Sequence, residues 1–251
     1  MMRSIARATN RVVLRIAAII YGMGSGRECN LCRWQGRAFL STGRGEKHRS
    51  DALCPRCRSV ERHRLAHLLL RDRLPVGGRT LHVAPEPSVA DWLRSISDRY
   101  LSVDLNGSRA MEAMDLTALS LPDASVTLVY ASHVLEHIPD DRAAITEIRR
   151  VLAPDGIAVI QVPIGGGQTV EDLTVTNPDE RLRRFGQRDH VRLYGLDLVG
   201  RLEDGGLYVE TLDDSAVPPQ LVERHRLVWR STRQVFVCRP RDGASFYRAD
   251  L

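Results

Sequence analysis

The hydrophobic pattern from about Arg79 onward alternates short apolar runs with stretches of helical character. This is the order expected of a parallel sheet covered by helices on both faces. The apolar runs predict strands and the stretches between them predict helices. We therefore expect an α/β fold, Rossmann-like and doubly wound, with a mostly parallel, seven-stranded sheet. The predicted strands are Arg79–Ala84, Tyr100–Asp104, Glu112–Asp115, Val126–Ser132 and Ile157–Val162, and the predicted helices are Ser88–Ser97 and Asp140–Leu152.

The residues that follow these strands are the candidates for chemistry, because such sheets bind ligands at the carboxyl ends of their strands. Asp104 ends the second strand roughly 20 residues past the first turn, where an acidic side chain can bind both ribose hydroxyls of a nucleoside cofactor. Asp115 and Leu116 follow the third strand, and the segment from Ser132 to His137 follows the fourth. Asp104 alone is a weak signal, but the combination predicts a cofactor site.

A long connection at residues 164–195 exceeds an ordinary strand-to-helix loop. It contains a predicted helix with Asn177 as N-cap, Pro178 at the first position and Gly186 after the end. We therefore expect an ordered lid rather than a slack loop. The polar side chains that this segment brings to the carboxyl edge of the sheet are candidates for substrate binding: Asp172, Asp189, Arg192 and Tyr194.

Charge is unevenly distributed along the chain. Residues 1–78 hold 16 Arg and Lys against 5 Asp and Glu, a net charge of +11, whereas the remainder has a net charge of −6. Such asymmetry can mean a polyanionic partner, either nucleic acid or an anionic membrane surface. It is equally consistent with arginines that surround a zinc–thiolate module.

The first 26 residues predict a basic amphipathic helix, because Arg3, Arg7, Arg11 and Arg15 recur every four residues. This helix either lies on a membrane or docks against the protein itself, and we favour docking. No apolar run reaches the roughly 18 residues of a transmembrane helix. We expect a soluble, cytoplasmic protein, with peripheral contact to the inner face of the membrane as the alternative.

Four of the five cysteines form two pairs with a two-residue gap. Zinc takes four thiolates at tetrahedral corners, and such a site leaves no open position for catalysis. Two disulfides would require an oxidising compartment, which nothing else in the sequence indicates. Cys29, Cys32, Cys54 and Cys57 therefore predict a structural zinc-ribbon module over residues 27–75, followed by the sheet domain over residues 79–251. A helix opened by Ser59 links the two and ends before Pro75.

Three segments carry a resemblance to a known family: Leu121–Val126, Ala131–Asp140 and Glu147–Gly156. Together they resemble the class I methyltransferases that use S-adenosylmethionine, of the type 11 kind. More narrowly, the blocks Cys54–Arg64 and Asp189–Gly195 resemble a bacterial subgroup with an N-terminal four-cysteine zinc knuckle.

The resemblance implies roles for several strand-end residues. Asp104 would hold the ribose, and Asp115 and Leu116 would lie by the adenine. Ser132 and His133 would face the methionine and the methyl group.

The first turn departs from the family, which usually has a glycine-rich loop there. This chain instead has Ala84, Pro85 and Glu86, whose Cβ atoms and fixed proline φ limit how closely the backbone approaches a cofactor. We expect a stiffer path in which these residues still line the cofactor and Glu86 binds its ammonium group. The alternative is a decayed pocket in a non-catalytic binding protein.

Methyl transfer is an in-line displacement, so the enzyme must align a nucleophile and, for a hydroxyl, remove its proton. Histidine suits that role near neutral pH, and we expect His190 as the base, then His133, then His137. The predicted reaction is O-methylation of a small polar acceptor such as a sugar or glycan hydroxyl. The alternative is an RNA methyltransferase whose zinc module contacts phosphates, although only Trp34 and Phe39 are available there for base stacking.

Overall fold

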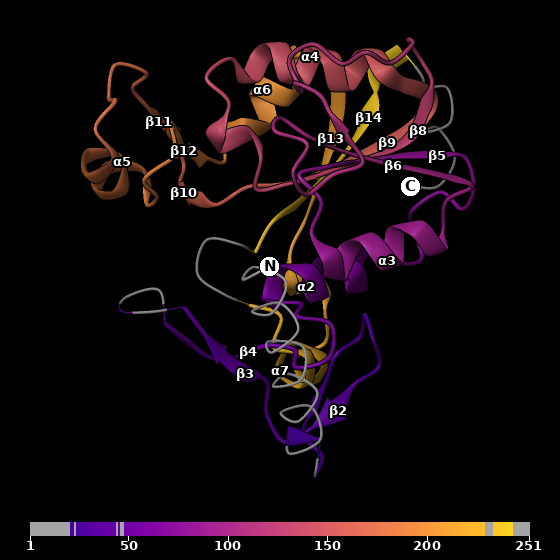
Figure 1. The fold of residues 1–251 in the computed structure, drawn as a ribbon, viewed down its shortest axis with the longest axis vertical. Coiled ribbons are helices and arrows are strands. Elements are labelled where there is room, and N and C mark those ends of the chain that lie inside the picture. The colour runs from indigo at the N-terminus through magenta and orange to yellow at the C-terminus, as the bar shows by residue number, and fades with distance from the viewer. Residues whose placement is uncertain (1–20, 23, 44, 46–47, 229–232, 243–251) are drawn as a thin grey trace, which may run out of the picture. The chain divides into compact units, whose positions relative to one another are not determined.

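The computed structural model describes residues 21–22, 24–43, 45, 48–228 and 233–242 (Figure 1). The predicted N-terminal helix falls mainly on residues 1–20, outside the described residues. Within the described part of the chain, no helix is both long and apolar enough to cross a bilayer. Two compact units are described separately below. Among the described residues, the smaller unit contains those up to 72, 87–92 and 213–229, and the larger unit contains 73–86, 93–212 and those after 230.

The larger unit is built on a seven-stranded sheet with the order β13-β14-β9-β8-β5-β6-β7. Neighbours from β9 to β7 are parallel, and β14 is antiparallel to both β9 and β13. The order reverses at β5, which pairs with β6 on one side and β8 on the other, so ligands are expected at the carboxyl ends of these strands. The predicted fold class is confirmed. The strands are β5 (Arg79–Val83), β6 (Arg99–Asp104), β7 (Glu112–Ala113), β8 (Val126–Ser132), β9 (Leu152–Gln161), β13 (Leu207–Leu212) and β14 (Val235–Pro240).

Helices α4 (Asp141–Val151) and α6 (Leu198–Asp204) lie along one face of this sheet (Figure 1). The Asp140 side chain caps α4 by accepting a hydrogen bond from the Ala143 N–H at 2.9 Å. The apolar side chains of α4 are fully buried in the sheet core. Burial of each large aliphatic side chain contributes roughly 1.5–3 kcal/mol to the free energy of folding. β9 begins directly at Leu152, so Pro154 and Gly156 lie within the first part of this strand. The buried stripe is Ala144, Ile145, Ile148 and Val151.

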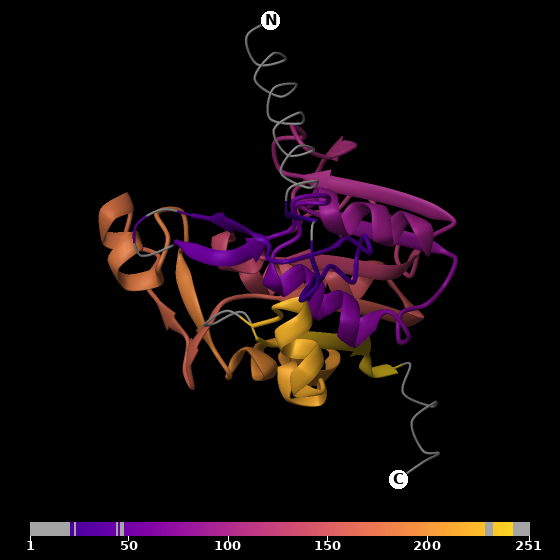
Figure 2. The ribbon, with the colours of Figure 1, turned by 90° about the horizontal axis from the view of Figure 1, so that it is seen from below.

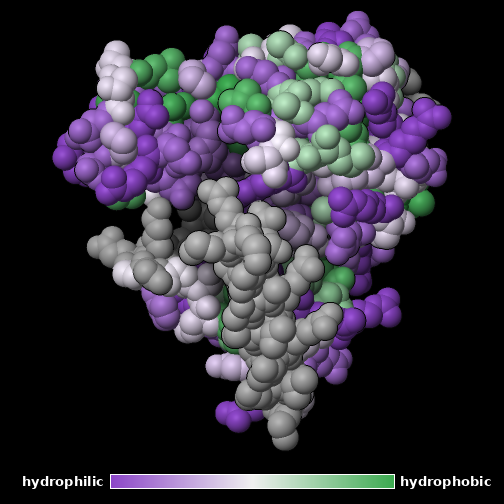
Figure 3. Space-filling view, viewed as in Figure 1, coloured by the Kyte–Doolittle hydropathy of each residue, from purple (hydrophilic) through white to green (hydrophobic). Residues whose placement is uncertain are grey.

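The lid segment, residues 164–195, folds as a small three-stranded sheet with one helix. α5 begins as predicted, with the Asn177 side chain accepting hydrogen bonds from two backbone N–H groups, and Gly186 follows it at φ +83°. Both ribbon views show the segment to one side of the large sheet (Figures 1 and 2). Its surface around α5 is mainly hydrophilic (Figure 3). The elements are β10 (Ile164–Gly166), β11 (Val170–Glu171), α5 (Pro178–Phe185) and β12 (Arg192–Gly195).

The smaller unit combines the cysteine module with helices from two other parts of the sequence. Helix α2 begins after Val60 rather than at Ser59. Residues 213–229 belong to this unit, although the sequence assigned them to the sheet domain, because Val217 and Leu227 share a core with Leu65. The elements are β1 (Arg27–Glu28), β2 (Gln35–Gly36), β3 (Leu40–Thr42), β4 (Arg49–Leu53), α2 (Glu61–Leu70), η3 (Asp214–Ala216) and α7 (Pro219–His225), while α3 (Pro87–Ser95) follows β5.

Candidate active site and zinc site

The glycine-free turn after β5 follows the path that glycine would allow. Ala84 has φ +47°, in the left-handed region that favours glycine. Its N–H donates a hydrogen bond to the Val103 carbonyl at 2.8 Å, which fixes the turn against β6. Pro85 follows, and Glu86 occupies the N-cap position of α3. Alanine therefore takes a left-handed conformation at this turn, which costs it more than it would cost glycine.

The two predicted acids stand at the carboxyl edge of the sheet. The Asp104 carboxylate accepts a hydrogen bond from the Asn106 N–H at 2.9 Å. Asp115 accepts two from Thr117, one from its N–H and one from its hydroxyl, each at 2.8 Å. These turns fix the orientation of both carboxylates. Leu116 is 4% exposed and packs in the core of the sheet.

The densest group of polar atoms follows β8. His133 has φ +56° and is followed by the short helix η2 (Leu135–His137). Its Nδ1 lies 3.2 Å from Oε1 of Glu136, a carboxylate that is 1% exposed. Among the described residues, no hydrogen-bond partner is aligned with His133 Nε2, Ser132 Oγ or either Glu136 oxygen. Buried polar atoms of this kind normally have a partner, so they indicate a ligand site.

Sequence reasoning missed two residues at the same edge. Gln161 ends β9 opposite Ser132 and is 2% exposed. Its Oε1 accepts a hydrogen bond from the Tyr130 hydroxyl at 3.2 Å, while its Nε2 has no partner in the described part of the chain. Leu105 is 68% exposed directly after Asp104 and offers an apolar surface to a ligand. Two signals in the sequence could have identified them. Gln161 is a polar residue at the end of an apolar strand, and Leu105 directly follows Asp104, the residue predicted to bind the ribose.

The structure brings the three predicted histidines together around Glu136. The rings of His137 and His190 meet edge to face, with centroids 4.7 Å apart, and His190 Nε2 lies 4.0 Å from Glu136 Oε1. His190 is only 3% exposed, and burial lowers its pKa. Its ring nitrogens contact the Phe185 carbonyl at 3.0 Å and the Gln187 amide at 2.6 Å. His190 is therefore less accessible as a base than the sequence suggested.

Arg192 and Tyr194, predicted to bind substrate, instead hold the protein's own groups. Arg192 is 1% exposed and pairs with Glu171 of the lid. Tyr194 is fully buried, its hydroxyl donates to Asp141 at 2.6 Å, and burial raises its pKa. We reassign both residues to fastening the lid to the turn after β8, because Arg192 donates to the carbonyls of Leu135, Ile138 and Pro139.

The two acids predicted to bind substrate differ in their surroundings. Asp172 pairs with Arg184 at 2.8 Å and accepts hydrogen bonds from Thr174, which lower its pKa. It therefore stabilises the lid internally. Asp189 is 72% exposed, and its carboxylate lies 3.5 Å from His137 Nδ1. Asp189 is thus the predicted substrate-binding residue that stands open to solvent beside the histidines.

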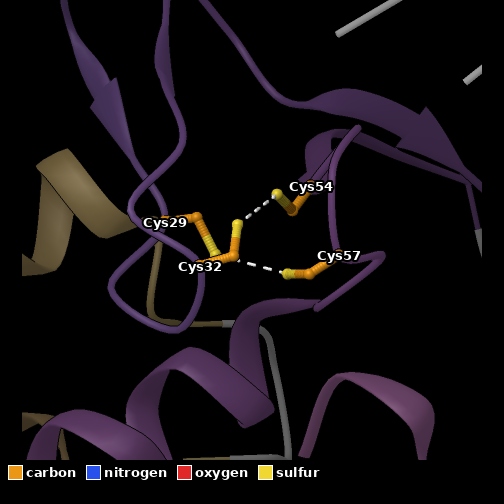
Figure 4. Close-up of side chains that lie close together, drawn as sticks. All are labelled: Cys29, Cys32, Cys54 and Cys57. Carbon is orange, nitrogen blue, oxygen red and sulfur yellow. Dashed lines mark hydrogen bonds between the residues drawn. The ribbon is translucent and has the colours of Figure 1, made fainter. Parts of the chain in front are cut away.

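The four predicted zinc ligands face one another from two knuckles (Figure 4). The sulfurs of Cys29 and Cys57 are 3.6 Å apart, as are those of Cys32 and Cys54, and all four lie within 4.8 Å of one another. A zinc ion with Zn–S bonds of about 2.3 Å separates its sulfurs by about 3.8 Å. In the described structure all four thiols are free of disulfides. The donor set therefore fits structural zinc.

The knuckles share one backbone pattern and two supporting side chains. Arg33 and Arg58, each just after the second cysteine of a knuckle, have φ of +58° and +66° and donate to the first cysteine's carbonyl. The Ser59 hydroxyl lies 3.2 Å from two of the sulfurs. Arg64 is fully buried and donates to the Ser59 carbonyl at 2.8 Å. Burial lowers the pKa of Arg64, while the charge of Cys29 raises it.

Comparison with known proteins gives a family. Residues 84–160 match the family described as "Methyltransferase domain". No curated protein matches the chain. Similar solved structures include an S-adenosylmethionine-dependent methyltransferase from Mesorhizobium loti (21% identity, 69% of this chain and 97% of that chain covered, TM-score 0.48). Another is the Burkholderia thailandensis 1,6-didemethyltoxoflavin-N1-methyltransferase (16% identity, 71% of this chain and 78% of that chain covered, TM-score 0.49). A third is a Haloferax volcanii complex of the Trm112 activator and a putative methyltransferase (17% identity, 69% of this chain and 87% of that chain covered, TM-score 0.47).

The carboxyl edge of the sheet fits S-adenosylmethionine. Asp104 offers an oriented carboxylate at the position expected for the ribose, and Ser132 and Gln161 offer buried polar atoms at the ends of β8 and β9. The family match includes the residues that follow all four strands from β5 to β8. The larger unit of this chain is therefore a class I, S-adenosylmethionine-dependent methyltransferase domain.

Proposed function

We propose that this methyltransferase methylates the hydroxyl of a small polar acceptor, such as a sugar or glycan, with His133 as general base. The observation that carries the proposal is the His133–Glu136 contact at 3.2 Å, with His133 Nε2 left without a partner among the described residues. A carboxylate at one imidazole nitrogen orients the ring and stabilises its protonated form. The other nitrogen can then accept the proton that a hydroxyl loses on methylation.

S-adenosylmethionine supplies an electrophilic methyl group on its sulfonium. His133 Nε2 takes the acceptor proton, and the buried Glu136 carboxylate stabilises the resulting imidazolium. The His133 side chain is 21% exposed and that of His190 is 3% exposed, but His133 Nε2 itself is buried, so an acceptor hydroxyl must displace neighbouring atoms to reach it. Asp189 and His137 stand beside this group and are suited to hold further hydroxyls of the acceptor.

The alternative acceptor, RNA, receives less support from the cysteine module. Trp34 and Phe39 are 7% and 2% exposed and pack against each other, with ring centroids 5.4 Å apart. Buried rings cannot stack on unpaired bases, which is a common mode of RNA recognition. A small polar acceptor is therefore the favoured substrate class.

Two measurements test the proposal. Isothermal titration should detect S-adenosylmethionine binding to the whole chain. Labelled methyl transfer into a pool of sugars and oligosaccharides should then fall about 10²–10⁴-fold in His133→Ala, with cofactor affinity nearly unchanged. His48→Ala, which alters an exposed histidine of the smaller unit, is the matched control and should behave as wild type. Unaltered turnover in His133→Ala would refute the base, and transfer into RNA instead of sugars would refute the acceptor class.

A further inference from the structure

A second group of metal-ligating side chains lies in the methyltransferase domain, separate in kind from the four cysteines. Glu136 and His137 come from η2 and His190 from the lid, and their donor atoms lie within 4.8 Å of one another. The Val191 N–H donates to the Glu136 carbonyl at 3.0 Å, which fixes these two segments side by side. We propose that Glu136, His137 and His190 bind a divalent transition-metal ion beside the methyl acceptor.

Both histidines are held in the orientation that metal ligands adopt. A metal-binding imidazole usually directs one nitrogen to a carbonyl or carboxylate, which leaves the other nitrogen for the ion. His190 Nδ1 lies 3.0 Å from the Phe185 carbonyl. His137 Nδ1 lies 3.3 Å from the Asp189 carbonyl and 3.5 Å from its carboxylate. In both rings Nε2 is thereby the nitrogen left for an ion.

Glu136 supplies the charge that a cation would balance. Its side chain is 1% exposed, and no described donor is aligned with either of its oxygens. A buried carboxylate without hydrogen bonds is costly unless a positive charge compensates it. The nearest imidazoles, those of His133 at 3.2 Å and His190 at 4.0 Å, contribute no fixed positive charge. A bound cation supplies that charge.

Gln187 covers the position that the ion would take on His190. Its amide nitrogen lies 2.6 Å from His190 Nε2, the atom whose lone pair would face the metal. An ion that binds there displaces this amide, which lies on the lid and needs to move only locally. The contact therefore explains how the imidazole lone pair is satisfied before metal binding.

The donor set selects the class of ion. Calcium and magnesium prefer oxygen ligands, whereas imidazole suits zinc, iron, copper and nickel, and a pair of histidines with one carboxylate leaves coordination positions open. One open position suits an acceptor hydroxyl. If the proposed O-methylation holds, a hydroxyl bound to the ion would have a lower pKa and would yield its proton to His133 more readily. The ion site itself does not depend on that reaction.

Cobalt(II) binding to the zinc-loaded protein tests the site without any assay of methyl transfer. The whole chain, with its cysteines filled by zinc, is equilibrated with cobalt, and bound cobalt and retained zinc are counted by elemental analysis. We expect one cobalt per chain with zinc retained, and the weak visible bands of nitrogen and oxygen ligation. Glu136→Gln and His137→Ala should each weaken cobalt binding roughly tenfold or more. His48→Ala should bind cobalt as wild type does.

His137→Ala is the decisive variant, because its side chain is 31% exposed and the protein should fold without it, which near-ultraviolet circular dichroism verifies. Three results would overturn the proposal. They are no cobalt beyond the cysteine site, cobalt binding that His137→Ala leaves unchanged, or cobalt that enters only with loss of zinc and an intense sulfur charge-transfer band. Failure of methyl transfer to sugars would leave these outcomes unaffected, so the two proposals fail separately.

Discussion

Replacing Arg192 with Met tests how the lid is fastened to the turn after β8. The guanidinium is 1% exposed, donates to three carbonyls of that turn, and pairs with Glu171 and Asp141. In the variant, the three carbonyls lose these hydrogen-bond donors. The carboxylates of Glu171 and Asp141 lose one of their neighbouring positive charges. Removing one partner of a buried ion pair costs about 3–5 kcal/mol, and we expect a loss of that order in the free energy of unfolding.

Arg201→Met is the matched control for this measurement. Arg201 contacts the same carboxylates, Asp141 at 3.0 Å and Glu171 at 3.3 Å, but is 18% exposed. Because Arg201 is more exposed and donates its hydrogen bonds to these two acids and not to the carbonyls of the turn, its loss should cost only about 1 kcal/mol. Urea denaturation followed by circular dichroism gives both values. Equal losses in the two variants would refute the view that the carbonyl contacts of Arg192 fasten the lid.

Three further predictions concern pH, backbone strain and zinc. Burial lowers the pKa of His67 to about 4, and the Asn30 amide contacts its Nδ1 at 3.2 Å, so the folded state needs the neutral ring. Its contribution is fully present above the unfolded pKa of about 6.5 and is lost as the pH falls toward 4, by about 2 kcal/mol at pH 5. The loss of stability between pH 8 and pH 5, measured by denaturation, should be smaller in His67→Gln than in wild type by about this amount. Ala84→Gly should stabilise the protein by about 1 kcal/mol in thermal denaturation, because it relieves the left-handed φ, and a destabilised variant would contradict that strain. Cys54→Ser should release zinc to a chromogenic chelator far faster than Cys238→Ser, which alters the buried cysteine outside the cluster.

Features that depend on local chemistry were predictable from sequence. The helix α5 has its cap at Asn177 and its stop at Gly186 because capping involves only neighbouring residues. The cysteine site follows from spacing alone, and the strands of the large sheet from short apolar runs. Position along the chain therefore sufficed for five strands of the sheet, the lid helix and the four clustered cysteines.

Features that depend on packing between distant segments were not predictable. The sequence ranked His190 first as base, but its burial arises from contact with Phe185, Gln187 and the turn after β8. The sequence predicted that Arg192 binds substrate. Only the folded lid shows that its guanidinium donates hydrogen bonds to carbonyls of the protein itself. Residues 213–229 likewise change units because of a shared apolar core, which no local signal marks.

The lid carries both His190 and Arg192, which are two residues apart. One ring contributes to the cluster at Glu136, while the other side chain holds the backbone of the segment that contains Glu136. Displacing the lid would therefore remove His190 from the cluster and free the carbonyls that Arg192 holds, whereas His133 and Glu136 would stay together on the turn after β8. The lid thus affects the proposed metal site directly and the proposed base only through the backbone that it supports.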